Sequence, residues 1–116
     1  SFYMYRAFVA MDTKEENYLG IARNALIKYF DICIDREYNV EISDMSNNKF
    51  RAFIMLLDIL KKERDSKKSA YYLTKLKEFY KKTYFADSMT GEISDPVQKS
   101  RCETINSIEK WVMDNE

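Results

Sequence analysis

The acidic residues between positions 31 and 37 come closest to an arrangement that could perform catalysis. Asp31 and Asp35 lie four residues apart, so they share one face of a helix, and Glu37 follows them. Paired carboxylates act as a general acid and a general base when their surroundings raise the pKa of one of them. Nothing nearby in the sequence suggests such a shift, and exposed acids on a helix usually form a solvated edge. We therefore expect a polar surface here.

Other catalytic arrangements lack their essential residues. The chain contains no histidine, which excludes Ser–His and Cys–His pairs and metal sites that need an imidazole. Gly20 and Gly91 stand alone, so there is no glycine-rich phosphate loop. Cys33 and Cys102 have no metal-type spacing, and we expect both to be reduced, buried thiols in a cytoplasmic protein. The sequence thus predicts a protein that is not an enzyme, with no catalytic residue, metal or cofactor.

The basic residues are unevenly distributed, although 19 of them balance 19 acidic residues. From Lys49 to Lys82 there are eleven Lys and Arg residues against four Asp and Glu, so the remaining segments carry the opposite excess. This asymmetry predicts one basic and one acidic face. Basic residues interleaved with tyrosines suit an RNA backbone. The alternative is that outer-face lysines serve only solubility. The acidic remainder would in addition let identical subunits stack head to tail, basic face against acidic face.

The elements that position these residues are predicted to be helices. The 116 residues suit one domain over 1–116, and two Gly and one Pro disfavour sandwiches and barrels. Apolar residues recur at helical spacing. We predict an all-α, compact bundle of about five helices over 1–10, 13–38, 46–64, 69–85 and 96–113. No apolar run approaches the ~20 residues needed to cross a bilayer, so we expect no membrane partner.

Local signals fix some of these boundaries. Thr13 followed by Glu16 forms a capping-box pattern that predicts the start of the second helix, and Asp95–Pro96 predicts the start of the last one. The third helix contains "AFIMLLDIL", which is apolar nearly all round and is predicted to lie at the centre of the bundle. In the last helix the predicted inward residues are Val97, Ile105, Ile108, Trp111 and Val112.

Two stretches carry a family resemblance. "ENYLGIARNALIKYF" at 16–30 and "NNKFRAFIMLLDILKKE" at 47–63 resemble segments of the small subunit of type III-A CRISPR interference complexes. Lys49 and Arg51 occupy the two basic positions of the second segment. The family's aromatic-x-Ala-Gly-Arg step falls at Tyr84–Ser88, where this chain has no arginine.

The order of the segments differs from that of the family. "YRAFVAM" at 5–11 resembles the family's last helix, which is missing after residue 113. Joined from Glu116 to Ser1, "WVMDNE" and "SFYMYRAFVA" would form one helical run in the family's order. We therefore predict a circularly permuted arrangement, with residues 1–10 as the displaced terminal helix of the bundle.

The resemblance implies a non-catalytic subunit that contacts the backbones of guide RNA and target RNA and bridges other CRISPR complex subunits. Lys49 and Arg51 are the first predicted phosphate ligands, at the start of a helix. Charge alone adds five further candidates, which are Lys61, Lys62, Lys75, Lys81 and Lys82. An ion pair with a nearby acid is an equal alternative for Arg51. Self-association or swapping of the terminal helix is a further expectation. The competing interpretation is a helical protein–protein interaction module, an adaptor or an immunity-type binder, that uses no nucleic acid.

Overall fold

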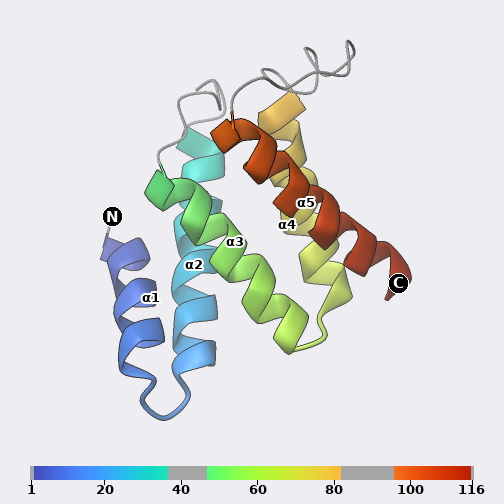
Figure 1. Cartoon of the computed structure of the whole chain (residues 1–116). Coiled ribbons are helices and arrows are strands. Elements are labelled where there is room, and N and C mark those ends of the chain that lie inside the picture. The colour runs from blue at the N-terminus through green and yellow to red at the C-terminus, as the bar shows by residue number, and fades with distance from the viewer. Residues whose placement is uncertain (1, 37–46, 82–95, 116) are drawn as a thin grey trace.

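A computed structural model describes residues 2–36, 47–81 and 96–115, and these fold into an all-α bundle, as predicted. Its five helices are α1 (Phe2–Thr13), α2 (Tyr18–Arg36), α3 (Asn47–Lys62), α4 (Ser66–Lys81) and α5 (Pro96–Asp114). Each helix packs mainly against the next one along the chain. The result is that α3 lies between the α1–α2 pair on one side and the α4–α5 pair on the other (Figure 1).

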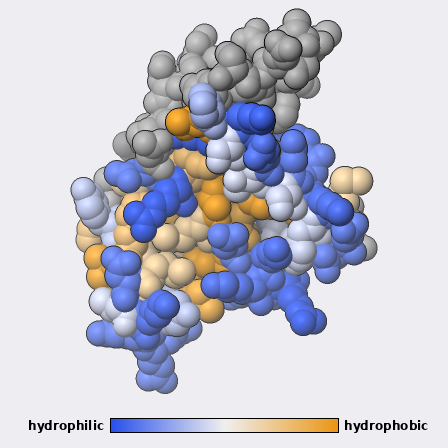
Figure 2. All heavy atoms as spheres, viewed as in Figure 1, coloured by the Kyte–Doolittle hydropathy of each residue, from blue (hydrophilic) through white to orange (hydrophobic). Residues whose placement is uncertain are grey.

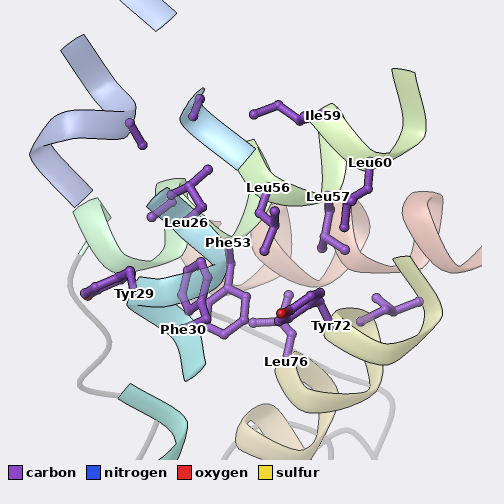
Figure 3. Packing of buried hydrophobic residues seen from close by; sticks show 14 of the residues in the cluster. Leu26, Tyr29, Phe30, Phe53, Leu56, Leu57, Ile59, Leu60, Tyr72 and Leu76 are labelled. Atoms are coloured by element: carbon purple, nitrogen blue, oxygen red, sulfur yellow. The ribbon is translucent and has the colours of Figure 1, made fainter. Parts of the chain in front are cut away.

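The core is centred on α3, which confirms its predicted position. Phe53 of α3 lies against Phe30 of α2, with ring centroids 3.6 Å apart. Figure 3 shows the leucines of α3 continuing this layer toward Tyr72 and Leu76 of α4. Burying one such large apolar side chain is worth about 1.5–3 kcal/mol relative to leaving it exposed. The largest side chains that are almost fully buried are Leu26, Phe30, Phe53, Leu56, Leu57, Ile59, Leu60, Leu76 and Ile105.

The α1–α2 connection corrects the first predicted helix boundary. Thr13 does not cap α2: it is the last residue of α1, and its hydroxyl donates to the Ala10 carbonyl. Lys14 and Asn17 adopt left-handed backbone conformations, with φ of 51° and 60°. These two residues reverse the chain, so α2 begins only at Tyr18. A capping-box pattern does not reveal that the preceding helix already extends over its first residue.

The α3–α4 connection also differs from the prediction, because α4 begins at Ser66 and not near residue 69. Arg64 has φ of 56°, its amide donates to the Lys61 carbonyl, and the Asp65 amide donates to the Leu60 carbonyl. This is the Schellman arrangement that ends a helix with one left-handed residue. Asp65 then caps α4, since its carboxylate accepts from the Lys68 amide at 3.0 Å.

One predicted core residue is exposed. Val97 lies in the first turn of α5, and 53% of its surface is accessible. Ile105 and Val112, further along the same helix, are buried as predicted. Helical spacing identifies the inward side of a helix, but it does not say how far along that helix its neighbours extend.

The two ends of the described chain bear on the predicted circular order. The start of α1 and the end of α5 lie on opposite sides of the molecule (Figure 1), so they do not form one helical run within a chain. Residues 2–13 nevertheless pack against α2 within the same bundle, with Ala7 and Ala10 buried. The permuted order stays a prediction, and the separation of the ends counts against it.

Candidate binding surfaces

A groove of about 380 Å³ runs along α3 between the end of α1 and the middle of α5. We call it the α3 groove. Its apolar lining comes from Met11, Phe50, Ile54, Met55 and Ile59, and its polar lining from Arg51, Asp58, Lys62 and Thr104. Figure 2 shows apolar side chains gathered over α1 and α3 on this face, with hydrophilic residues around them. An apolar surface bordered by charges is typical of a site for another macromolecule.

Arg51 has a structural partner that the sequence did not predict. Its guanidinium carbon lies 4.7 Å from the centre of the Phe8 ring of α1. A cation over an aromatic face is attracted by the ring's quadrupole, and arginine stacks well because its guanidinium is planar. Arg51 therefore joins α3 to α1 at the edge of the α3 groove. Neither of its predicted roles, an RNA contact or an ion pair, anticipated this packing.

Asp58 is the one acidic residue that lines the α3 groove. Partial burial among the apolar lining raises the pKa of its carboxyl group, and the charges of Lys61 and Lys62 partly offset this effect. Lys62 follows Asp58 by four residues, so the two share a face of α3. The groove thus presents Arg51 and Lys62 toward its two ends, with the acid between them.

The turn between α3 and α4 carries a cluster of exposed cations, which we call the basic turn. Its members are Lys61, Lys62, Arg64, Lys67 and Lys68. The two acids of this segment are already engaged: Glu63 pairs with Arg23 of α2, and Asp65 caps α4 and lies 3.9 Å from Lys68. The basic turn therefore keeps an excess of positive charge that can attract phosphates.

The predicted RNA ligands that the structure describes have different neighbours. Lys62 and Arg51 share the α3 groove, whereas the Lys61 ammonium lies 5.9 Å from the Trp111 ring of α5. Lys75 lies 5.6 Å from the Tyr71 ring on α4, and Lys49 is half-buried at the start of α3. The side chain of Lys81, and the whole of Lys82, lie outside the described residues, as do Tyr84–Ser88.

A second, smaller cleft of about 210 Å³ lies between α1 and α2, and sequence analysis missed it. Its lining consists of Tyr3, Arg6, Ile21, Asn24, Ala25 and Lys28. Arg6 and Lys28 are 22 positions apart and lie outside the basic segment from Lys49 to Lys82. The sequence signal that could have indicated a close contact between α1 and α2 is the pair of alanines on each helix. These four residues, Ala7, Ala10, Ala22 and Ala25, are all buried.

One of the two aspartates considered for catalysis, Asp31, has a structural role. Asp31 accepts a hydrogen bond from the Tyr72 hydroxyl at 3.2 Å, which links α2 to α4. Burial, followed by the charge of Asp31, raises the pKa of Tyr72. The side chains of Asp35 and Glu37 lie outside the described residues. Within the described part of the chain, no three acidic or cysteine side chains are close enough to hold a metal ion.

The structure describes the side chain of one of the two cysteines. Cys102 is a buried free thiol in α5, as predicted, and burial raises the pKa of its sulfhydryl group. The side chain of Cys33 lies outside the described residues. Among the helices described here, none is long and apolar enough to cross a membrane.

Comparisons with known proteins found no match for this chain. The sequence matches no protein-family model, no curated protein and no solved structure. Function is therefore inferred from the α3 groove, the basic turn, the cleft between α1 and α2, and the sequence resemblance.

Proposed function

We propose that this chain is a non-catalytic helical interaction module whose α3 groove receives an amphipathic helix from a protein partner. The observation that carries this proposal is the apolar lining of the groove. Its residues Phe50, Ile54 and Met55 are only partly buried. Covering apolar surface of this kind is the main driving force of helix-in-groove recognition.

The charges of the groove specify the partner further. Arg51 and Lys62 are eleven residues apart on α3, which corresponds to roughly 16 Å along the helix axis. A partner helix whose flank carries acidic residues about three turns apart matches both cations. The partner is thus expected to present an apolar stripe toward Ile54 and Met55 with acidic residues beside it.

The test compares two methionines in the full-length chain. Met55 lines the α3 groove, whereas Met113 lies on α5 with 67% of its surface exposed and is not part of the groove lining. A photo-cross-linking residue at position 55 should capture a partner segment that is an amphipathic helix with an acidic flank. Met55→Glu should abolish co-purification of that partner, and the matched variant Met113→Glu should retain it. Equal recovery with both variants would show that the groove is not the binding surface.

A second candidate function follows from the sequence resemblance. This is a non-catalytic small subunit of a type III-A CRISPR ribonucleoprotein that contacts guide RNA and target RNA and bridges neighbouring subunits. Its support is the resemblance of residues 16–30 and 47–63, together with the positive charge of the basic turn.

Salt dependence separates the two candidate functions. Binding to a mixed-sequence RNA should weaken steeply with added salt if the protein neutralises phosphates. The double change Lys49→Glu and Arg51→Glu should weaken such binding across all sequences alike. Absence of RNA binding at low salt, with the partner helix still captured at position 55, would leave the protein-interaction function alone.

A further inference from the structure

Among the residues that the structure describes, those lining the cleft between α1 and α2 supply hydrogen-bond donors and positive charge and include no carboxylate. Its charged lining residues are Arg6 and Lys28, and its polar lining is completed by Asn24 and Tyr3. Arg6, Asn24 and Lys28 are exposed, so a ligand can reach them from solvent. From this arrangement we propose that the cleft binds a phosphate group.

A hydrogen bond from the neighbouring arginine restrains the Asn24 side chain. The Arg23 side chain donates from Nε to the Asn24 carboxamide oxygen at 3.2 Å, and its Nη1 pairs with Glu63, the residue that follows α3. With its carboxamide oxygen accepting from Arg23, Asn24 has its NH₂ group as a hydrogen-bond donor on the other side of the amide. Glu63 thereby fixes Arg23, and Arg23 in turn fixes the amide beside the cleft.

The two cations approach the cleft from different helices. Lys28 follows Asn24 by four residues on α2, so both lie on one face of that helix, and Arg6 comes from α1. The Lys28 ammonium lies 5.8 Å from the centre of the Tyr3 ring, which borders the same cleft. The buried Ala25 also borders the cleft.

These groups suit a phosphate better than a single carboxylate. A phosphate offers at least two anionic oxygens, which can accept from the planar guanidinium fork of Arg6 while another accepts from Lys28. The Asn24 amide supplies a further donor. The cleft shares no lining residue with the α3 groove, so this inference goes beyond the proposed function and does not depend on it.

The experiment titrates the full-length chain with inorganic phosphate and follows backbone amide signals by NMR, with sodium chloride at matched ionic strength as the reference. Saturable shifts are expected around Arg6 and between Asn24 and Lys28. The double variant Arg6→Gln, Lys28→Gln should weaken binding by roughly tenfold or more, because two charge-assisted contacts are lost. The matched variant Lys99→Gln, Lys110→Gln removes two exposed cations of α5 and should change the affinity less than about twofold.

Two further measurements make the outcome decisive. Asn24→Asp replaces the amide by a carboxylate of the same size and should also abolish the saturable shifts, while circular dichroism reports an unchanged fold. A mixed-sequence RNA oligonucleotide distinguishes the source of the phosphate. Loss of RNA affinity in the Arg6→Gln, Lys28→Gln variant assigns the cleft to an RNA backbone, and unchanged RNA affinity beside saturable phosphate shifts assigns it to a small phosphate ligand. Shifts that sodium chloride reproduces, or an equal loss in the α5 control variant, would overturn the proposal.

Discussion

The contact between Arg51 and Phe8 predicts that Arg51 contributes to the stability of the free protein. Its guanidinium lies 4.7 Å from the ring centre, and Arg51 is exposed while Phe8 is half-buried. Cation–π pairs at exposed positions contribute about 0.5–1 kcal/mol. We therefore expect this coupling energy between Arg51→Gln and Phe8→Leu in a double-mutant cycle, measured by urea unfolding followed by circular dichroism.

Two controls separate stacking from charge. Arg51→Lys keeps the positive charge but loses the planar group, so it should lose a substantial part of the coupling. Lys110→Gln removes an exposed cation from α5 and should alter the free energy of unfolding by no more than about 0.5 kcal/mol. A coupling energy near zero in the cycle would refute this structural role of Arg51.

Three further predictions concern stability and its pH dependence. Arg64→Gly should raise the free energy of unfolding by about 1 kcal/mol, because glycine adopts the φ of 56° without steric cost; a gain no larger than that of Arg64→Ala would contradict this. Tyr72→Phe should lower it by about 1 kcal/mol through loss of the hydrogen bond to Asp31, and an unchanged urea midpoint would argue against that bond. Asp58→Asn should stabilise the protein at neutral pH. The folded-state pKa of Asp58 is raised above 3.8, so just above pH 3.8 the folded state binds more protons than the unfolded state. The free energy of unfolding therefore falls as the pH rises through this interval. The advantage of Asp58→Asn should therefore shrink as unfolding is measured at pH values falling toward 3.8, and a constant advantage would refute the assignment.

The helices and most of the core could be predicted because their signal is local. Leu26, Tyr29 and Phe30 recur at helical spacing in α2, and all three are buried. In α3 the apolar residues surround the helix so widely that only a central position could cover them, and α3 does lie at the centre. The spacing of apolar residues within a single helix is enough to identify its buried side.

The boundaries failed where the backbone conformation, and not hydrophobic spacing, decides the structure. Thr13 ends α1 because Lys14 turns into the left-handed region, and Ser66 begins α4 because Arg64 does the same before the Asp65 cap. Lysine and arginine are not residues that signal this conformation, since glycine and asparagine usually fill such positions. Asn17 is the one residue of these turns whose type is typical of the conformation, whereas Lys14 and Arg64 carry no such signal.

Positive charge was the least predictable feature, since a count along the chain does not specify a direction in space. Adjacent helical residues point about 100° apart, and so Lys61 lies beside Trp111 of α5 whereas Lys62 lines the α3 groove. Two consecutive cations can consequently have different neighbours even where both belong to the basic turn.

A site for an anion depends on which cations lack an acid beside them, and this is set by contacts between helices. Lys77 of the basic segment is paired with Glu109 of α5 at 2.5 Å, and Glu63 of the same segment is paired with Arg23 of α2. Arg6 and Lys28 belong to segments with an overall acidic excess, yet the described residues that line their cleft include no carboxylate. The electrostatic attraction for a phosphate is local, falling off over about 10 Å at ordinary ionic strength. Two cations that share one cleft can therefore attract a phosphate even though their segments carry an overall acidic excess.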